Sequence, residues 1–174
     1  MIDPIQQYRQ LRDEVDRKAA ELETVHADWM ACKKGCSGCC MNLSVWPVEF
    51  FSILAELKET GWPRPQLNLD GECVYLDAGS ACQIYPFRPL ICRTHGLPLV
   101  YWHEDADPPE YGVMFCEKNF KGADKVTFTA ENTLNMEEAN EKLARLNLAF
   151  IEENDDAELE PQTRIELRRL MDFL

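Results

Sequence analysis

The sequence lacks the features that would place it in several common classes. It has no apolar run near the ~20 residues that a membrane-spanning helix needs, and its first residues have neither the basic nor the apolar region of a secretory signal. Acidic residues outnumber basic ones by 31 to 18, so the basic patches that bind phosphate backbones are not expected. No phosphate-binding glycine loop, serine triad or dinucleotide fingerprint is present. We therefore expect a cytoplasmic protein with neither a membrane nor a nucleic acid as partner.

Cysteine, in contrast, is abundant and concentrated in one part of the chain. Four cysteines lie within nine residues, in the run Cys-Lys-Lys-Gly-Cys-Ser-Gly-Cys-Cys that starts at residue 32. In a reducing compartment thiols stay free to bind metal, and thiolates hold zinc or iron–sulfur clusters. We therefore expect a metal ion partner, with zinc as the favoured cofactor and iron or a [4Fe-4S] cluster as the alternative. All eight cysteines are candidate ligands: Cys32, Cys36, Cys39, Cys40, Cys73, Cys82, Cys92 and Cys116.

The four closely spaced cysteines can form one cluster in either of two local structures. Gly35 and Gly38 would let a loop bend around a metal, whereas a helix would place the four sulfurs on one face. Adjacent Cys39 and Cys40 point in different directions, so they either serve different sites or contribute one ligand between them. Eight cysteines suffice for two four-thiolate sites, or for one site and spare thiols. Disulfides and inert buried cysteines are the competing interpretations, the latter strongest for Cys73 and Cys116.

Acidic residues are missing around most of these cysteines. None occurs between Asp28 and Glu49 or between Asp77 and Glu104, although an even spread would place about eight there. Carboxylates would repel a thiolate site with a formal charge near −2, whereas cations would offset it. The acid-free segments keep four basic residues. We expect them to meet around one centre, with Arg88 or Arg93 next to the bound metal or cluster; the four are Lys33, Lys34, Arg88 and Arg93.

Histidines and acids outside the cysteine run are weaker candidates. His95 follows Arg93 closely and is a possible auxiliary ligand or acid–base group, although a loop histidine is more often a surface residue. We expect His26 to be structural or solvated and His103 to pair with nearby acids. An acidic loop could hold a hard cation, but a solvated loop is the simpler interpretation; its acids are Glu104, Asp105, Asp107 and Glu110.

The predicted fold class is mainly α with small irregular β elements, and the helices flank a cysteine-rich metal-binding centre. At 174 residues the chain is expected to form a single domain. Its cysteine core covers about 32–116, a long N-terminal helix about 4–30, and C-terminal helices about 132–173. Within these limits the periodicity predicts helices over about 47–61, 132–154 and 161–173, and strands over 73–76, 97–102 and 126–129.

Three cysteine-containing segments resemble a known family. Cys36-Ser-Gly-Cys39-Cys40, a helix, Gly-Glu-Cys73-Val-Tyr-Leu and Cys82-Gln-Ile-Tyr-Pro-Phe-Arg-Pro-Leu-Ile-Cys92-Arg93 resemble the putative zinc- or iron-chelating domain family of CxxCxxCC cysteine-cluster proteins. The resemblance implies metal chelation. The family includes the flagellin lysine N-methylases, which implies a possible link to iron–sulfur chemistry. This chain spaces its first cysteine pair as C-x3-C where the family has C-x2-C.

Three functions remain open at this point. The first is metal chelation through cysteine thiolates. The second is an iron–sulfur enzyme, either an oxidoreductase or a protein-modifying methyltransferase. The spacing of Cys32, Cys36 and Cys39 also resembles the cluster loop of radical S-adenosylmethionine enzymes, but the chain is too short for their usual barrel. The third is a structural zinc module that presents a surface to a protein partner. Catalytic residues and activity stay open, because a sequence shows neither an open coordination position nor a substrate cleft.

Overall fold

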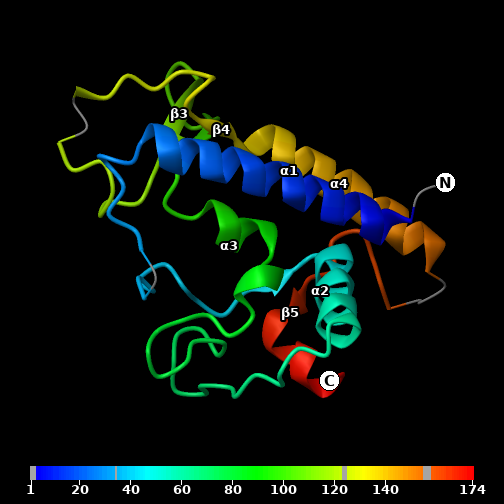
Figure 1. Ribbon diagram of the computed structural model, residues 1–174. Helices are drawn as coiled ribbons and strands as arrows, with labels where there is room; N and C mark the ends of the chain where they lie inside the picture. Colours follow the sequence, from blue (N-terminus) through cyan, green and yellow to red (C-terminus); the bar gives the residue numbers. More distant parts are fainter. Residues whose placement is uncertain (1–2, 34, 123–124, 155–157) are drawn as a thin grey trace.

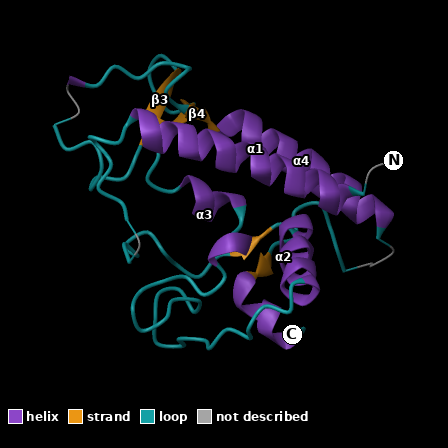
Figure 2. Cartoon of the chain, in the orientation of Figure 1, coloured by secondary structure: helices purple, strands orange, loops and turns teal. Residues whose placement is uncertain are grey.

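Helices joined by long loops make up most of the structure, a computed structural model that describes residues 3–33, 35–122, 125–154 and 158–174 (Figures 1 and 2). The prediction of a mainly helical chain with small β elements is confirmed. In chain order the elements are α1 (Pro4–Val25), β1 (Ser44–Val45), α2 (Pro47–Glu59), η1 (Tyr85–Phe87), α3 (Leu90–Thr94), β2 (Leu99–His103), β3 (Glu110–Met114), β4 (Leu134–Asn135), α4 (Met136–Glu153), β5 (Ile165–Glu166) and η3 (Leu167–Asp172).

Helix α1 begins where the sequence predicts but ends earlier. The Asp3 side chain accepts a hydrogen bond from the Ile5 amide at 3.1 Å, and Pro4 occupies the first helical position. The helix ends at Val25, not near residue 30. His26 follows, almost fully buried, with its Nε2 2.7 Å from the Asn132 carbonyl oxygen. This tertiary contact, which periodicity cannot reveal, holds the chain as it leaves the helix.

Helices α1 and α4 lie side by side and form the first core (Figure 1). Helix α4 begins at Met136, where the Asn135 side chain accepts hydrogen bonds from the amides of Glu137 and Glu138. The two helices bury their apolar faces against each other, against the start of β2 and against α3. The buried members include Tyr8, Leu11, Val15, Leu22, Leu90, Leu97, Met136, Leu143 and Phe150.

Helix α2 organises a second core beside the C-terminus. It begins at Pro47 as predicted and ends at Glu59, followed by Gly61 with a φ of +59°, a conformation that glycine adopts without strain. Its buried face packs on the loop after it, on η1 and on η3. Cys73 and Cys82 pack against this core, whose members include Phe50, Ile53, Leu57, Val74, Tyr75, Ile84, Phe87, Leu167 and Leu170.

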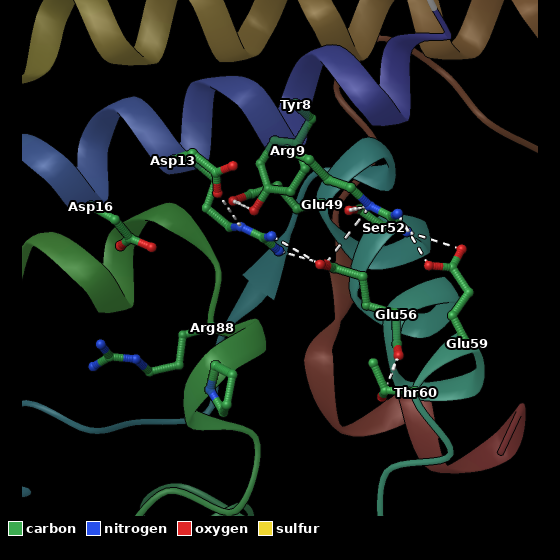
Figure 3. Close-up of polar contacts among 12 residues, drawn as sticks. Tyr8, Arg9, Asp13, Asp16, Glu49, Ser52, Glu56, Glu59, Thr60 and Arg88 are labelled. Carbon is green, nitrogen blue, oxygen red and sulfur yellow. Dashed lines mark hydrogen bonds and ion pairs between the residues drawn. The ribbon is translucent and has the colours of Figure 1, made fainter.

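An ionic cluster joins α1 to α2. The Arg12 guanidinium, 8 % exposed, binds the Glu56 carboxylate with two hydrogen bonds of 2.5 and 2.8 Å. Arg9 binds Glu59 and approaches Ser52 (Figure 3). These contacts fix the angle at which α2 crosses α1, because a bidentate guanidinium–carboxylate pair constrains both side chains.

Two small sheets complete the fold. Strand β2 pairs antiparallel with β3 and parallel with β4, and β1 pairs antiparallel with β5 near the C-terminus. The predicted strand at 97–102 corresponds to β2. Strand β3 was not predicted, because it follows directly on the acidic loop. Within the described ranges, every helix is too short or too polar to cross a bilayer.

Three other predictions of local structure were wrong. Residues 73–76 form turns and a single bridge between Leu76 and Cys82 instead of a strand. Residues 126–129 are loop, although they alternate like a strand. The last helix, predicted over 161–173, is the short strand β5 followed by the 3-10 helix η3. In each case tertiary contacts decide the secondary structure of a short apolar segment, which periodicity alone leaves ambiguous.

Candidate metal centre

The cysteine run from residue 32 to 40 is a loop and not a helix in its described residues. Two consecutive turns shape this loop. The Cys36 amide donates a hydrogen bond to the Lys33 carbonyl, and the Cys40 amide donates one to the Ser37 carbonyl, both at 2.9 Å. Gly35 has a φ of +88°, which favours glycine. The expected loop geometry is therefore confirmed there, whereas Lys34 lies outside the described residues.

Three of the eight cysteines form a first thiol group: Cys32, Cys36 and Cys116. Gly96 is the point of contact, because a Cβ at this position would lie 3.2 Å from Cys32 Sγ and 3.9 Å from Cys116 Cβ. The Cys32 thiol also hydrogen-bonds to Cys36 and to Asn119. Two distant segments, the cysteine loop and the chain after β3, therefore bring their thiols to one place.

Four more cysteines form a second thiol group: Cys40, Cys73, Cys82 and Cys92. The bridge between Leu76 and Cys82 folds the Cys73 and Cys82 segments back on each other, and the Cys82 thiol accepts a hydrogen bond from the Ile84 amide. Asn42 links the end of the cysteine loop to this hairpin, since its side chain accepts a 3.0 Å bond from the Val74 amide. Cys39 stands beside the group and hydrogen-bonds to Cys40.

The thiols of the second group influence one another's ionisation. Burial raises the pKa of Cys92 to about 12, opposed by Arg88 and reinforced by Cys82, Cys73 and Cys40. Burial also raises the pKa of Cys40 to about 11, with further contributions from Cys39, Cys73 and Cys82. These thiols are therefore protonated near neutral pH in the metal-free chain, and a metal ion must displace their protons to bind.

The two groups are neighbourhoods of thiols and not closed coordination shells. All eight cysteines are free and partly buried, but among the residues that the structure describes no three Cys, His, Asp or Glu side chains converge enough to hold an ion. The donor set nevertheless fits zinc or iron, because both ions prefer thiolates and the groups hold at least three each. A thiophilic ion would draw each group together by movement of the loops that carry it.

Arg88 and Arg93, both predicted beside the site, occupy different environments. The Arg88 guanidinium donates to the Cys92 carbonyl at 3.1 Å and lies 3.6 Å from the centre of the Tyr85 ring; burial raises the pKa of Cys92 and Cys82, and the Arg88 charge offsets part of this rise. Figure 3 shows it directed away from the α1–α2 ionic cluster. The buried Arg93 guanidinium instead binds Asp16 on α1 and the carbonyls of Pro86 and Arg88. Arg88 is therefore the arginine whose charge reaches the thiols.

Two polar residues that the sequence did not single out support the first thiol group. The Asn119 side chain accepts bonds from the Ala31 and Cys32 amides at 2.8 and 3.1 Å and donates to the Gly96 carbonyl at 2.7 Å. The Lys118 ammonium lies at the cysteine loop, because a Cβ on Gly38 would be 2.9 Å from it. Nothing in the sequence reveals these roles except that both residues closely follow Cys116.

The histidines and the acidic loop take secondary places. His26 is structural, as expected, and packs edge-on against Phe120 at 5.0 Å. His95 Nδ1 lies 2.6 Å from the Ile91 carbonyl oxygen. The His103 ring lies over Gly112 on the neighbouring strand, since a Cβ there would come within 2.5 Å of it. The acids of residues 104–110 are largely exposed.

Glu49 holds the helix that carries Cys92. This carboxylate is buried on α2, accepts the Leu90 amide at 3.1 Å and the Trp46 amide at 3.3 Å, and receives the Tyr8 hydroxyl at 3.4 Å. Leu90 is the first residue of α3. Burial nevertheless raises the pKa of Glu49 above its usual value, because removal from water outweighs these donors.

We expect Glu49→Gln to change how stability depends on pH. The native protein retains the Glu49 proton at pH values where the unfolded chain has lost it, so this group's contribution falls as pH rises above about 4.5. Gln carries no such proton. The variant should therefore gain stability relative to the wild type as the pH rises above about 4.5, measured by urea unfolding. A difference between the two proteins that stays constant as the pH rises would contradict the raised pKa of Glu49.

Comparison with known proteins finds one family model that resembles the segment carrying this site. Residues 31–110 match the family model CxxCxxCC, described as "Putative zinc- or iron-chelating domain". No curated protein and no solved structure matches the chain. The matched residues include seven of the eight cysteines and both predicted arginines, and only Cys116 lies beyond them. Residues 31–110, a little under half of the chain, are therefore similar to the CxxCxxCC family of putative zinc- or iron-chelating domains.

Proposed function

We propose that this protein chelates a zinc or iron ion through cysteine thiolates, with zinc preferred. One observation carries the proposal: cysteines from four separate segments, at residues 40, 73, 82 and 92, gather in one neighbourhood. The family description supports the same class of ligand. The free thiols of all eight cysteines suit a reducing compartment such as the cytoplasm.

The chain's own residues prepare this neighbourhood for a negatively charged centre. Four thiolates around a divalent ion leave a formal charge near −2, which nearby cations stabilise. Arg88 supplies such a charge beside Cys92, and the Ile84 amide donates a hydrogen bond to the Cys82 sulfur. Amide donors of this kind orient thiolate ligands and stabilise their charge. When bound, the ion would supply a cross-link between segments that share no regular secondary structure.

A structural role for the metal is the second candidate. Between α2 and η1 the chain runs through a long stretch of turns and loop, on the far side of α3 from α1 and α4 (Figure 1). Zinc sites commonly stabilise such loop-rich segments because their binding energy is coupled to folding. Two hollows of about 250 and 390 Å³ lie along the α1–α4 seam, and no cysteine lines either of them.

Metal content tests the proposal directly. Protein purified under reducing conditions without chelator should contain at least one equivalent of zinc plus iron, because thiolate sites bind tightly. Elemental analysis measures the amount, and an anaerobic optical spectrum distinguishes the forms. Colourless protein with zinc is the expected result, whereas brown protein with acid-labile sulfide would identify an iron–sulfur cluster. Less than about 0.3 equivalents of both metals together would exclude chelation as the function.

A further inference from the structure

We infer that the cysteine loop divides its thiols between two separate metal sites, one formed by Cys32, Cys36 and Cys116 and the other by Cys40, Cys73, Cys82 and Cys92. The inference rests on the proposed chelating function and specifies its ligands and stoichiometry. It also gives a role to Cys116, which lies outside the segment that matches the family model.

The first site depends on contacts that tie both ends of the ligand set to one backbone position. Cys32 Sγ and Cys116 Cβ both pack against Gly96, where the φ of +93° and the lack of a side chain allow this approach. The Asn119 side chain accepts hydrogen bonds from the Ala31 and Cys32 backbone amides and donates one to the Gly96 carbonyl. The Asn119 backbone amide donates a hydrogen bond to the Cys116 carbonyl at 2.9 Å. The side chain and the backbone amide of Asn119 together therefore connect the segments that carry Cys32, Gly96 and Cys116.

The second site depends on a different set of contacts. The Asn42 side chain, in the loop after Cys40, accepts a hydrogen bond from the Val74 amide. The Gln83 amide donates a hydrogen bond to the Tyr75 carbonyl at 2.8 Å, which keeps the Cys73 and Cys82 segments together. Arg88 bonds the Cys92 carbonyl and so connects α3 to the same region. The thiols whose charges influence the ionisation of Cys92 are those of Cys82, Cys73 and Cys40, and all three belong to the second site. The electrostatic neighbours of Cys32, in contrast, are Cys36 and Cys116.

The boundary between the sites falls inside the cysteine loop. The turn from Ser37 to Cys40 separates Cys36 from Cys40. At this turn Gly38 leaves space for the Lys118 ammonium, which lies 2.9 Å from the position of a Cβ. A cation between two thiolate sites reduces the repulsion between their negative charges. A side chain at position 38 would require the flexible Lys118 side chain to move.

Metal stoichiometry distinguishes two sites from one. Apo-protein titrated with zinc alone should bind two ions per chain in the wild type and one in either Cys116→Ser or Cys82→Ser. The double variant should bind none. A wild type that binds a single ion, or single variants that each lose all their metal, would overturn the division. A wild type that binds no ion would instead refute the proposed function, so the two failures are distinguishable.

Protection from alkylation provides a second measurement that needs no variant. With one equivalent of zinc added to wild-type apo-protein, cysteines should become resistant to a maleimide in blocks, as read by mass spectrometry of the peptides. Cys32, Cys36 and Cys116 should be protected together, and Cys40, Cys73, Cys82 and Cys92 together. Joint protection of Cys116 with Cys82 or Cys92, without the rest of either block, would overturn the assignment.

Discussion

Cys92→Ser should lower the melting temperature of the metal-loaded protein by about 10 °C, because it removes a ligand that connects α3 to the loops. The segment from residue 62 to 84 contains no helix or extended strand and relies on its partners for order. Removing a ligand forfeits several kcal/mol of binding energy that is coupled to folding. In a chain of this length each kcal/mol corresponds to roughly 2–4 °C. Differential scanning calorimetry of protein at full zinc occupancy measures the effect.

The metal-free proteins supply the control. After chelation, the wild type should melt near the temperature of the Cys92→Ser variant, and the variant should lose little further stability. Serine is close in size to cysteine, so a purely packing role for this half-buried side chain predicts a small loss. If the variant is destabilised equally with and without metal, Cys92 acts by packing and is not a ligand.

The helices could be predicted from sequence because their signals are local. Asp3 and Pro4 mark the start of α1, and Pro47 and Gly61 bracket α2, so capping and periodicity suffice. The short strands could not be predicted in the same way. Residues 126–129 alternate like a strand but form a loop, in which Phe128 packs on Phe115 and Phe120. Residues 165–166 do pair, with β1, more than 110 residues earlier in the chain.

The candidate site was predictable in its residue types but not in its arrangement. The two acid-free segments do meet, since Cys40 interacts with both Cys82 and Cys92. Of the two arginines in these segments, Arg93 is paired with Asp16 on α1 and not directed at the thiols. The division of the cysteines depends on Asn119 and Gly96, whose roles come from long-range hydrogen bonds and backbone approach. No spacing rule encodes such contacts.

Arg93→Met should destabilise the protein by about 3 kcal/mol or more, with or without metal. The Arg93 guanidinium is buried and binds the Asp16 carboxylate on α1 and two carbonyl oxygens of the segment before α3. Methionine fills similar space but removes the donors to the Pro86 and Arg88 carbonyl oxygens, and each lost donor to a buried oxygen typically costs about 1–3 kcal/mol, whereas the partly exposed Asp16 carboxylate adds less. The melting temperature should fall by roughly 6–12 °C. Calorimetry on metal-loaded and chelated protein tests this expectation.

Arg88→Met is the matched variant, and it should show the opposite pattern. Arg88 is partly exposed and bonds only the Tyr85 and Cys92 carbonyls in the described structure, so its loss should cost little stability in the chelated protein. Its charge reaches the Cys82 and Cys92 thiols, and zinc should therefore dissociate more readily to a competing chelator. Arg168→Met, which removes only an exposed pair with Glu166, should change neither property. Faster zinc loss from Arg93→Met than from Arg88→Met, at equal foldedness, would show that Arg93 and not Arg88 compensates the thiolate charge.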